Sequence, residues 1–157
     1  AVVKGFNRAR ERIAGWTFEA DGLDIVEKGL RRTYRQARRD MKRAAKSRAT
    51  EDLHEWRKAV KYFWHQSEVL RRHVDLFRKN YREQFHQLSS ILGDDHDLAL
   101  LREMIIVDPE HYGSPDVVLA FVKVIDKRRK KLQNDALKIG REVFAEKPKR
   151  YIKGVLT

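Results

Sequence analysis

Apolar residues recur along most of this chain at intervals of three and four positions, the spacing of one face of an α-helix. A clear example is the set Leu23, Val26, Leu30, Ala37, Met41 and Ala44. No segment keeps an apolar–polar alternation of period two, so we predict no β-sheet. The pattern therefore predicts an all-α protein.

Proline, glycine and capping residues divide the pattern into predicted helices over residues 2–14, 23–46, 50–74, 75–107 and 115–145. Thr50 is the expected N-cap of the third helix, because Glu51 and Asp52 follow it in the first turn. Ser114 and Pro115 form the corresponding start of the fifth. We expect Lys147 and Pro148 to end that helix and to leave a short tail with room for one further turn.

Long helices joined by short turns place successive helices antiparallel. We therefore predict an antiparallel up-and-down bundle of about four to five long helices. The chain has 157 residues, which is enough for one domain with a sizeable core. We expect a single domain over residues 1–157.

The charge of the chain points to an anionic partner. Lys and Arg number 35 against 23 Asp and Glu, which gives a net charge of +12. Charged residues make up 37% of the chain, against about 25% in an average protein. Such an excess repels itself unless a partner neutralises it. Nucleic acid, an anionic membrane and a soluble polyanion are the candidates.

The lack of cysteine and the lack of a long apolar run exclude several classes of protein. The chain has no cysteine, which excludes disulfides and thiolate chemistry and fits a reducing compartment. No apolar run approaches the roughly 20 residues of a membrane span. We therefore expect a cytoplasmic protein.

The positive charge falls on helix faces. In the third helix His54, Lys58, Lys61 and His65 lie within about 60° of one another, opposite a core face that includes Trp56 and Phe63. An ordinary solvated face mixes signs at i,i+4 spacing, whereas these stripes carry one sign. Arg offers a planar fork of donors to phosphate, Lys a point charge, and His a donor that can also become charged.

We predict a phosphate-binding site on three such stripes. The second helix contributes Arg31, Arg35, Arg38, Arg39 and Lys42, the third His54, Arg57, Lys58, Lys61 and His65, and the fifth Lys127, Arg128 and Lys131.

Several segments resemble one family. The segment Leu53-His54-Glu55-Trp56-Arg57-Lys58-Ala59-Val60-Lys61-Tyr62 is similar to the histidine-bearing helix of CHAD domains, the conserved histidine α-helical domains. Residues 29–39 resemble the family's Arg-rich helix, residues 88–101 its Leu-Gly…Asp…Leu helix, and residues 136–151 its closing segment. These motifs follow one another in the family's order across about residues 23–151.

The resemblance implies a function and a partner. Such domains are built from two similar helical bundles that face each other across a basic cleft, and they bind inorganic polyphosphate, some of them at polyphosphate granules. This chain resembles the second bundle. Two consequences stay open: the single half binds more weakly, or a second bundle or second copy completes the cleft. The resemblance implies roles for most of the residues above, while Lys42, His65 and Lys127 rest on the stripes alone.

Other functions were weighed against this one. A basic helix in a DNA groove would explain the charge, so a nucleic-acid-binding protein is the main alternative, and an adaptor for an acidic protein is a third. The run Asp94-Asp95-His96-Asp97 suggests a metal, but one helix turn rarely closes such a site. We expect Asp97 to hold a cation of a neighbouring helix instead. We expect no catalytic residue, metal or cofactor.

The aromatic residues are expected to divide between core and surface. We expect Trp16 and Phe121 in the core with most of the other aromatics. Tyr34 and Tyr62 are the candidates for stacking on a base or for binding a phosphate oxygen.

Overall fold

The structure is a computed structural model that describes residues 2–17, 24–70 and 79–156. Its elements are α1 (Val2–Ala14), α2 (Asp24–Ser47), α3 (Thr50–Leu70), α4 (Lys79–Val107), the 3-10 helix η1 (Pro109–Tyr112), α5 (Pro115–Val143) and α6 (Pro148–Leu156). No strand occurs in these ranges. The prediction of an all-α fold is confirmed.

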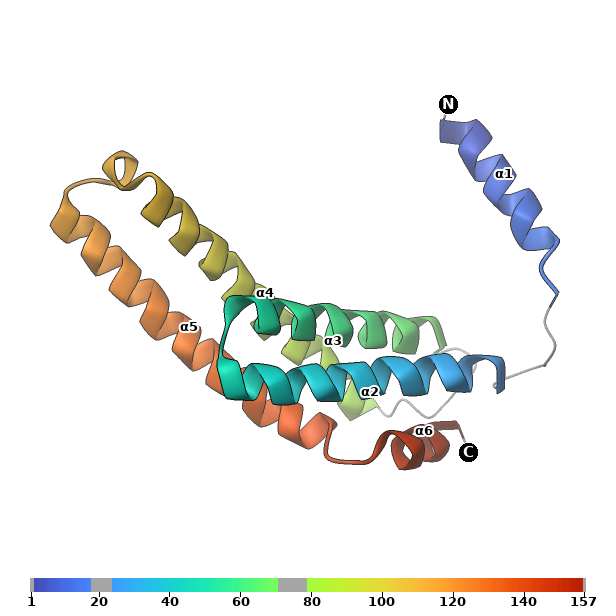
Figure 1. Cartoon of the computed structure of the whole chain (residues 1–157). Coiled ribbons are helices and arrows are strands. Elements are labelled where there is room, and N and C mark those ends of the chain that lie inside the picture. Colours follow the sequence, from blue (N-terminus) through green and yellow to red (C-terminus); the bar gives the residue numbers. More distant parts are fainter. Residues whose placement is uncertain (1, 18–23, 71–78, 157) are drawn as a thin grey trace.

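Helices α2 to α5 pack in chain order as an antiparallel bundle (Figure 1). α2 pairs with α3, α3 with α4, and α4 with α5, while α6 covers part of α2. The predicted up-and-down bundle is therefore confirmed. α4 and α5 run on beyond the α2–α3 pair as a hairpin closed by η1, and α1 contacts none of the other elements in the described ranges (Figure 1).

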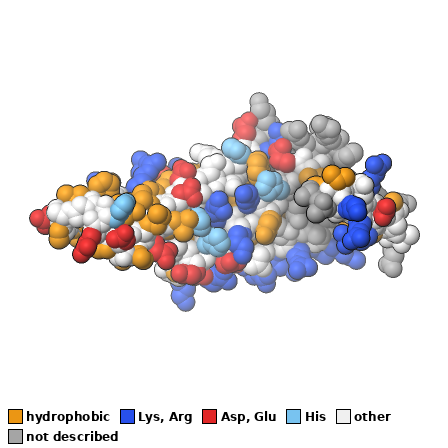
Figure 2. Space-filling view, turned by 90° about the horizontal axis from the view of Figure 1, so that it is seen from above, with side chains coloured by type: hydrophobic (Ala, Val, Ile, Leu, Met, Phe, Trp, Pro, Cys, Tyr) orange, Lys and Arg blue, Asp and Glu red, His pale blue; other side chains and the backbone are white. Residues whose placement is uncertain are grey.

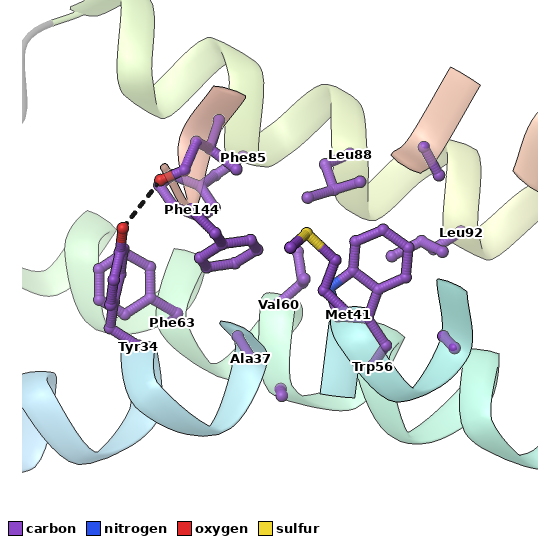
Figure 3. Close-up of a cluster of buried hydrophobic side chains, with 14 of the residues drawn as sticks. Tyr34, Ala37, Met41, Trp56, Val60, Phe63, Phe85, Leu88, Leu92 and Phe144 are labelled. Atoms are coloured by element: carbon purple, nitrogen blue, oxygen red, sulfur yellow. Dashed lines mark hydrogen bonds between the residues drawn. The ribbon is translucent and has the colours of Figure 1, made fainter. Parts of the chain in front are cut away.

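Aromatic side chains fill the centre of the bundle, where α2, α3, α4, α5 and α6 meet. Tyr34 stacks on Tyr151, with ring centroids 4.3 Å apart, and meets Phe144 edge-on at 5.2 Å. Phe63 and Phe85 continue this cluster, and Trp56 packs beside Met41 further along (Figure 3). The core face predicted for α3 is thus confirmed.

The prediction that Tyr34 could stack on a base or bind a phosphate oxygen is wrong, because Tyr34 lies in the core. It has no exposed surface. Its position falls on the same side of α2 as Leu30 and Ala37. The hydroxyl group donates to the carbonyl oxygens of Val143 at 3.1 Å and Glu146 at 3.2 Å, so burial leaves it satisfied.

The expected core positions of Phe121 and Trp16 are wrong. Phe121 is 54% exposed and Trp16 is 61% exposed. Phe121 follows the apolar spacing of α5, and Trp16 lies two residues after the end of α1. They stay exposed because Phe121 lies where α5 has passed the end of the α2–α3 pair, and Trp16 follows α1, which contacts no other element within the described chain.

Most predicted helix boundaries hold within one or two residues. Ser114 precedes α5 in an extended conformation with Pro115 as the first helical residue, as expected. At α3 the cap is one residue earlier than predicted, since the carbonyl oxygen of Ala49 accepts the amide of Leu53. Pro148 begins α6, a helix of 9 residues, where the sequence predicted a short tail with room for one further turn. The predicted helix ends in 71–78 lie outside the described residues.

Candidate functional site

The outward surface of the α2–α3 hairpin carries most of the predicted site residues. On α2, Arg35 and Arg39 lie about 140–180° around the helix from the buried Leu30. On α3, Lys58 and Lys61 lie about 140–160° from the buried Trp56. We call this surface the basic face. It comprises Arg32, Arg35, Arg39, Lys42, Lys58, Lys61 and His65, all exposed except Lys58, which is half-buried.

A groove of about 720 Å³ runs between α2 and α3 on the basic face. Arg32, Arg39 and Lys58 line it together with the neutral side chains of Thr33, Gln36, Tyr62 and Gln66. Asp40 and Glu55 also line it, so the groove itself is mixed in sign. Its polar hydroxyl and amide groups add hydrogen-bond donors to the cations.

The two carboxylates of the groove already have partners. Asp40 accepts from Gln36 Nε2 at 2.9 Å and lies 3.3 Å from Arg43 Nη2. Glu55 accepts from Lys58 Nζ at 3.0 Å. This hydrogen bond lowers the pKa of Glu55 and raises the pKa of Lys58. At pH 7 Lys58 therefore stays charged, and the negative charge of Glu55 offsets its positive charge.

Other cations of the basic face lack such partners. Arg32, Arg35, Lys42 and Lys61 form no hydrogen bond or ion pair with any residue in the described part of the chain. Among the described residues, Arg39 donates only to the neutral amide oxygen of Gln36. Cations that stay in water without a counter-charge repel one another and favour an incoming anion.

His54 and Arg57 lie at the border between α3 and α4. The imidazole rings of His54 and His96 are 4.9 Å apart. The guanidinium of Arg57 lies against Gly93, where an added Cβ would be 3.8 Å from Nε. That Nε is buried and has no hydrogen-bond partner within the described chain. Figure 2 shows histidine and basic side chains side by side over the middle of the molecule.

Arg31 and Arg38 lie within about 40° of Lys42 around α2, at the edge of the basic face nearest to the end of α5. Arg38 Nε donates to the carbonyl oxygen of Phe144 at 2.9 Å, where α5 ends. Arg31 is 3.6 Å from Glu27 of its own helix. Arg38 thus holds a helix end in place, a role that its position in a basic stripe did not indicate.

The structure does not gather all three stripes into one site. The stripes of α2 and α3 meet on the basic face, with His54 and Arg57 at one border and Arg38 at the other. The predicted residues of α5, Lys127, Arg128 and Lys131, are exposed, and none of them lines the groove.

Sequence reasoning missed the buried charge pair of the bundle. Asp95, not Asp97, holds a cation of a neighbouring helix: Arg129 Nε donates to it at 3.0 Å. Asp97 is largely exposed, and its one ion-pair partner in the part of the chain that the structure describes is His96 of its own helix. The spacing of Asp95 from Leu88 and Leu92 already places it on the core face of α4, and this could have identified it.

The described ranges contain neither a membrane-spanning helix nor a cluster of metal-binding side chains. No helix there is long and apolar enough to cross a membrane. No group of three or more His, Cys, Asp or Glu side chains there is placed to hold a metal ion.

A family model described as the CHAD domain matches residues 4–105, more than half of the chain. The chain belongs to the CHAD-domain family. No curated protein and no solved structure gives a match. The matched part of this CHAD domain includes the basic face, His54, Arg57 and Gly93, whereas α5, α6 and the expected closing segment over 136–151 lie beyond it.

Proposed function

We propose that this CHAD domain binds inorganic polyphosphate on its basic face. One observation carries the proposal: Arg32, Arg35, Lys42 and Lys61 are cations without a counter-charge in the described chain, on the outward surface of the α2–α3 hairpin, and Arg32 also lines the groove. The CHAD-domain family is linked in general to polyphosphate binding, and a negatively charged phosphate chain is the kind of ligand that these cations would bind.

The chemistry of the basic face suits a chain of phosphates. Arginine can meet a phosphate with two parallel hydrogen bonds, and lysine adds a mobile point charge. Successive cations along α2 and α3 would neutralise successive phosphates and release their counterions, as proteins do on DNA. The groove adds hydroxyl and amide donors from Thr33 and Gln36. No contact of this kind requires a base.

The border of the face offers a further donor. Arg57 Nε is buried without a partner in the described chain, and a phosphate oxygen is the kind of acceptor that would satisfy it. His54, beside His96, gains charge when protonated and can then donate from both ring nitrogens.

We propose binding without catalysis. The carboxylates of the groove, Asp40 and Glu55, are held by Arg43, Gln36 and Lys58. The hydrogen bond from Lys58 lowers the pKa of Glu55, which makes this carboxylate a poor general base.

Single-stranded nucleic acid is the competing ligand, and Tyr62 is the observation that favours it. This ring is 59% exposed and lines the groove, so a base could stack on it among the cations. Polyphosphate has no base to stack, so Tyr62→Ala should lower the affinity for single-stranded DNA more than the affinity for polyphosphate, which would lose only a hydroxyl donor.

The test is a calorimetric titration with long-chain polyphosphate at two salt concentrations, with single-stranded and duplex DNA at equal phosphate as comparisons. We expect tight, salt-sensitive binding that prefers polyphosphate. Arg35→Ala and Lys61→Ala should each weaken it and reduce the salt slope by about 1. Lys123→Ala removes an exposed cation near the start of α5, outside the basic face, and is the matched control.

Undiminished binding by the double variant Arg35→Ala/Lys61→Ala would overturn the site, and equal or tighter binding to DNA would overturn the choice of ligand. Arg38→Ala is not a suitable probe. Its guanidinium holds the end of α5, so a loss of affinity could come from a structural change.

A further inference from the structure

The hairpin of α4, η1 and α5 exposes a large apolar surface where it projects beyond the α2–α3 pair. We call residues 98–126 the tip. Its exposed apolar side chains are Leu100, Leu101, Met104, Ile106 and Val107 on α4, and Val117, Leu119, Phe121 and Val124 on α5. Val107 is 77% exposed and Val124 is 68% exposed. Contiguous apolar surface of this kind marks an interaction site in a water-soluble bundle.

Acidic groups surround this apolar surface. Glu103, Asp108, Glu110 and Asp116 lie in the tip, and Asp126 pairs there with Arg102. Lys123 is the remaining cation of the segment. Figure 2 shows apolar and acidic side chains together at the left end of the molecule. On a chain with a net charge of +12, the tip is an acidic region.

Helix α1 has the complementary surface. Val3, Phe6 and Ile13 are exposed apolar residues at helical spacing. Lys4, Arg8, Arg10 and Arg12 make the helix basic, with Glu11 as its single acidic residue. α1 contacts none of the other described elements. An amphipathic helix is stable in water mainly when its apolar face is packed, so α1 requires a partner surface.

We infer that α1 of one copy of this chain docks on the tip of a second copy. The apolar face of α1 would cover the tip, and its basic residues would meet the acidic ones around it. Contact between two tips would instead bring Glu103, Asp108 and Glu110 of both copies together, which like charges oppose.

The arrangement of the chain favours a second copy over contact within one molecule. α1 joins the bundle at the beginning of α2, whereas the tip lies beyond the other end of α2 (Figure 1). The 24 residues of α2 span about 36 Å between these points. Two copies that exchange α1 form two identical contacts about one two-fold axis, which closes the assembly as a dimer.

Sedimentation of the full chain tests the inference. We expect the wild-type protein to be a dimer at micromolar concentration. Phe6→Asp in α1 and Phe121→Asp in the tip should each give a monomer, because each places a charge in both contacts. Val69→Asp changes an apolar residue of α3 that is 74% exposed and belongs to neither surface, so it should remain a dimer.

A mixture of the two variants separates this arrangement from others. Phe6→Asp copies keep an intact tip and Phe121→Asp copies keep an intact α1. The mixture should therefore form a heterodimer with one intact contact, weaker than the wild-type dimer. Helical content by circular dichroism should fall in the monomeric variants by no more than the share of the 13 residues of α1, since both side chains are exposed in the single copy and only α1 loses a packed face.

Three results would overturn the inference. A monomeric wild-type chain would show that the tip does not bind a second copy. A dimer that survives Phe6→Asp but not Phe121→Asp would indicate contact between tips. A mixture that remains monomeric would exclude the pairing of α1 with the tip.

Discussion

Arg129 of α5 reaches across to the buried carboxylate of Asp95 on α4. Its Nε donates to Oδ1 at 3.0 Å and its Nη2 to Oδ2 at 3.3 Å, a bidentate pair. The same Nη2 also donates to the hydroxyl of Thr50 on α3, and Gln133 Nε2 donates to Asp95 at 3.1 Å. The Asp95–Arg129 pair thus connects α3, α4 and α5 at the point where the α4–α5 hairpin leaves the bundle.

Removing this carboxylate should strongly destabilise the bundle. In Asp95→Ala, Arg129 keeps its charge with a side chain only 12% exposed and without a counter-ion. We expect the free energy of unfolding to fall by about 3–5 kcal/mol. Asp126→Ala is the matched control, because it breaks the exposed pair with Arg102 on the same two helices.

That control should cost less than about 1 kcal/mol. Urea denaturation followed by circular dichroism measures both variants. Equal losses in the two would mean that the Asp95 pair contributes no more than a surface ion pair.

Gly140 sets the approach of α5 to the core. A Cβ at this position would lie 2.7 Å from Cζ2 of the Trp56 ring and 3.0 Å from the sulfur of Met41. Trp56 is fully buried, so the ring has no room to move away. We expect Gly140→Ala to lower the free energy of unfolding by about 1–3 kcal/mol in urea denaturation.

Gly29 provides the matched control for Gly140, since a Cβ there would meet nothing within 4 Å. It lies inside α2, where the backbone is helical and does not require glycine. Gly29→Ala should therefore raise the free energy of unfolding by about 0.5–1 kcal/mol. If both substitutions change stability in the same direction, the close approach at Gly140 is not what limits alanine there.

The groove should bind polyphosphate more tightly in acid. The hydrogen bond from Lys58 holds the pKa of Glu55 below its ordinary value of 4.5. The Lys58–Glu55 pair contributes its full stabilisation above the ordinary pKa of Glu55. This contribution is lost as the pH falls through the lowered pKa of Glu55 in the folded protein. Protonation of Glu55 then releases Lys58, which makes the groove more positive. We expect the affinity to rise as the pH falls through that range.

Glu55→Gln isolates this effect from the titration of other groups. Gln cannot ionise, so the variant should bind more tightly than the wild type at neutral pH, and the difference should vanish below the pKa of Glu55. Calorimetry at several pH values measures both proteins. A difference that persists at low pH would indicate that Glu55 acts through its shape and not through its charge.

The sequence by itself determined the features that depend on one helix at a time. The apolar spacing placed Leu30, Ala37 and Met41 on the buried side of α2, and Ser114 with Pro115 marked the start of α5. The cationic stripes of α2 and α3 were likewise predictable, and the motif around His54 led to the family. These follow from helical geometry, which sets the direction of each side chain relative to its own axis.

Only the tertiary structure decided what each side chain meets. Tyr34 and Tyr62 looked alike in the sequence, but α5 and α6 cover only Tyr34. Phe121 kept a core-like spacing and became exposed because no helix of the described chain covers the tip. Asp95 became the buried carboxylate because Arg129 of α5 lies opposite it. Helical periodicity contains no information on which neighbour lies at a given angle, and burial and pairing depend on that neighbour.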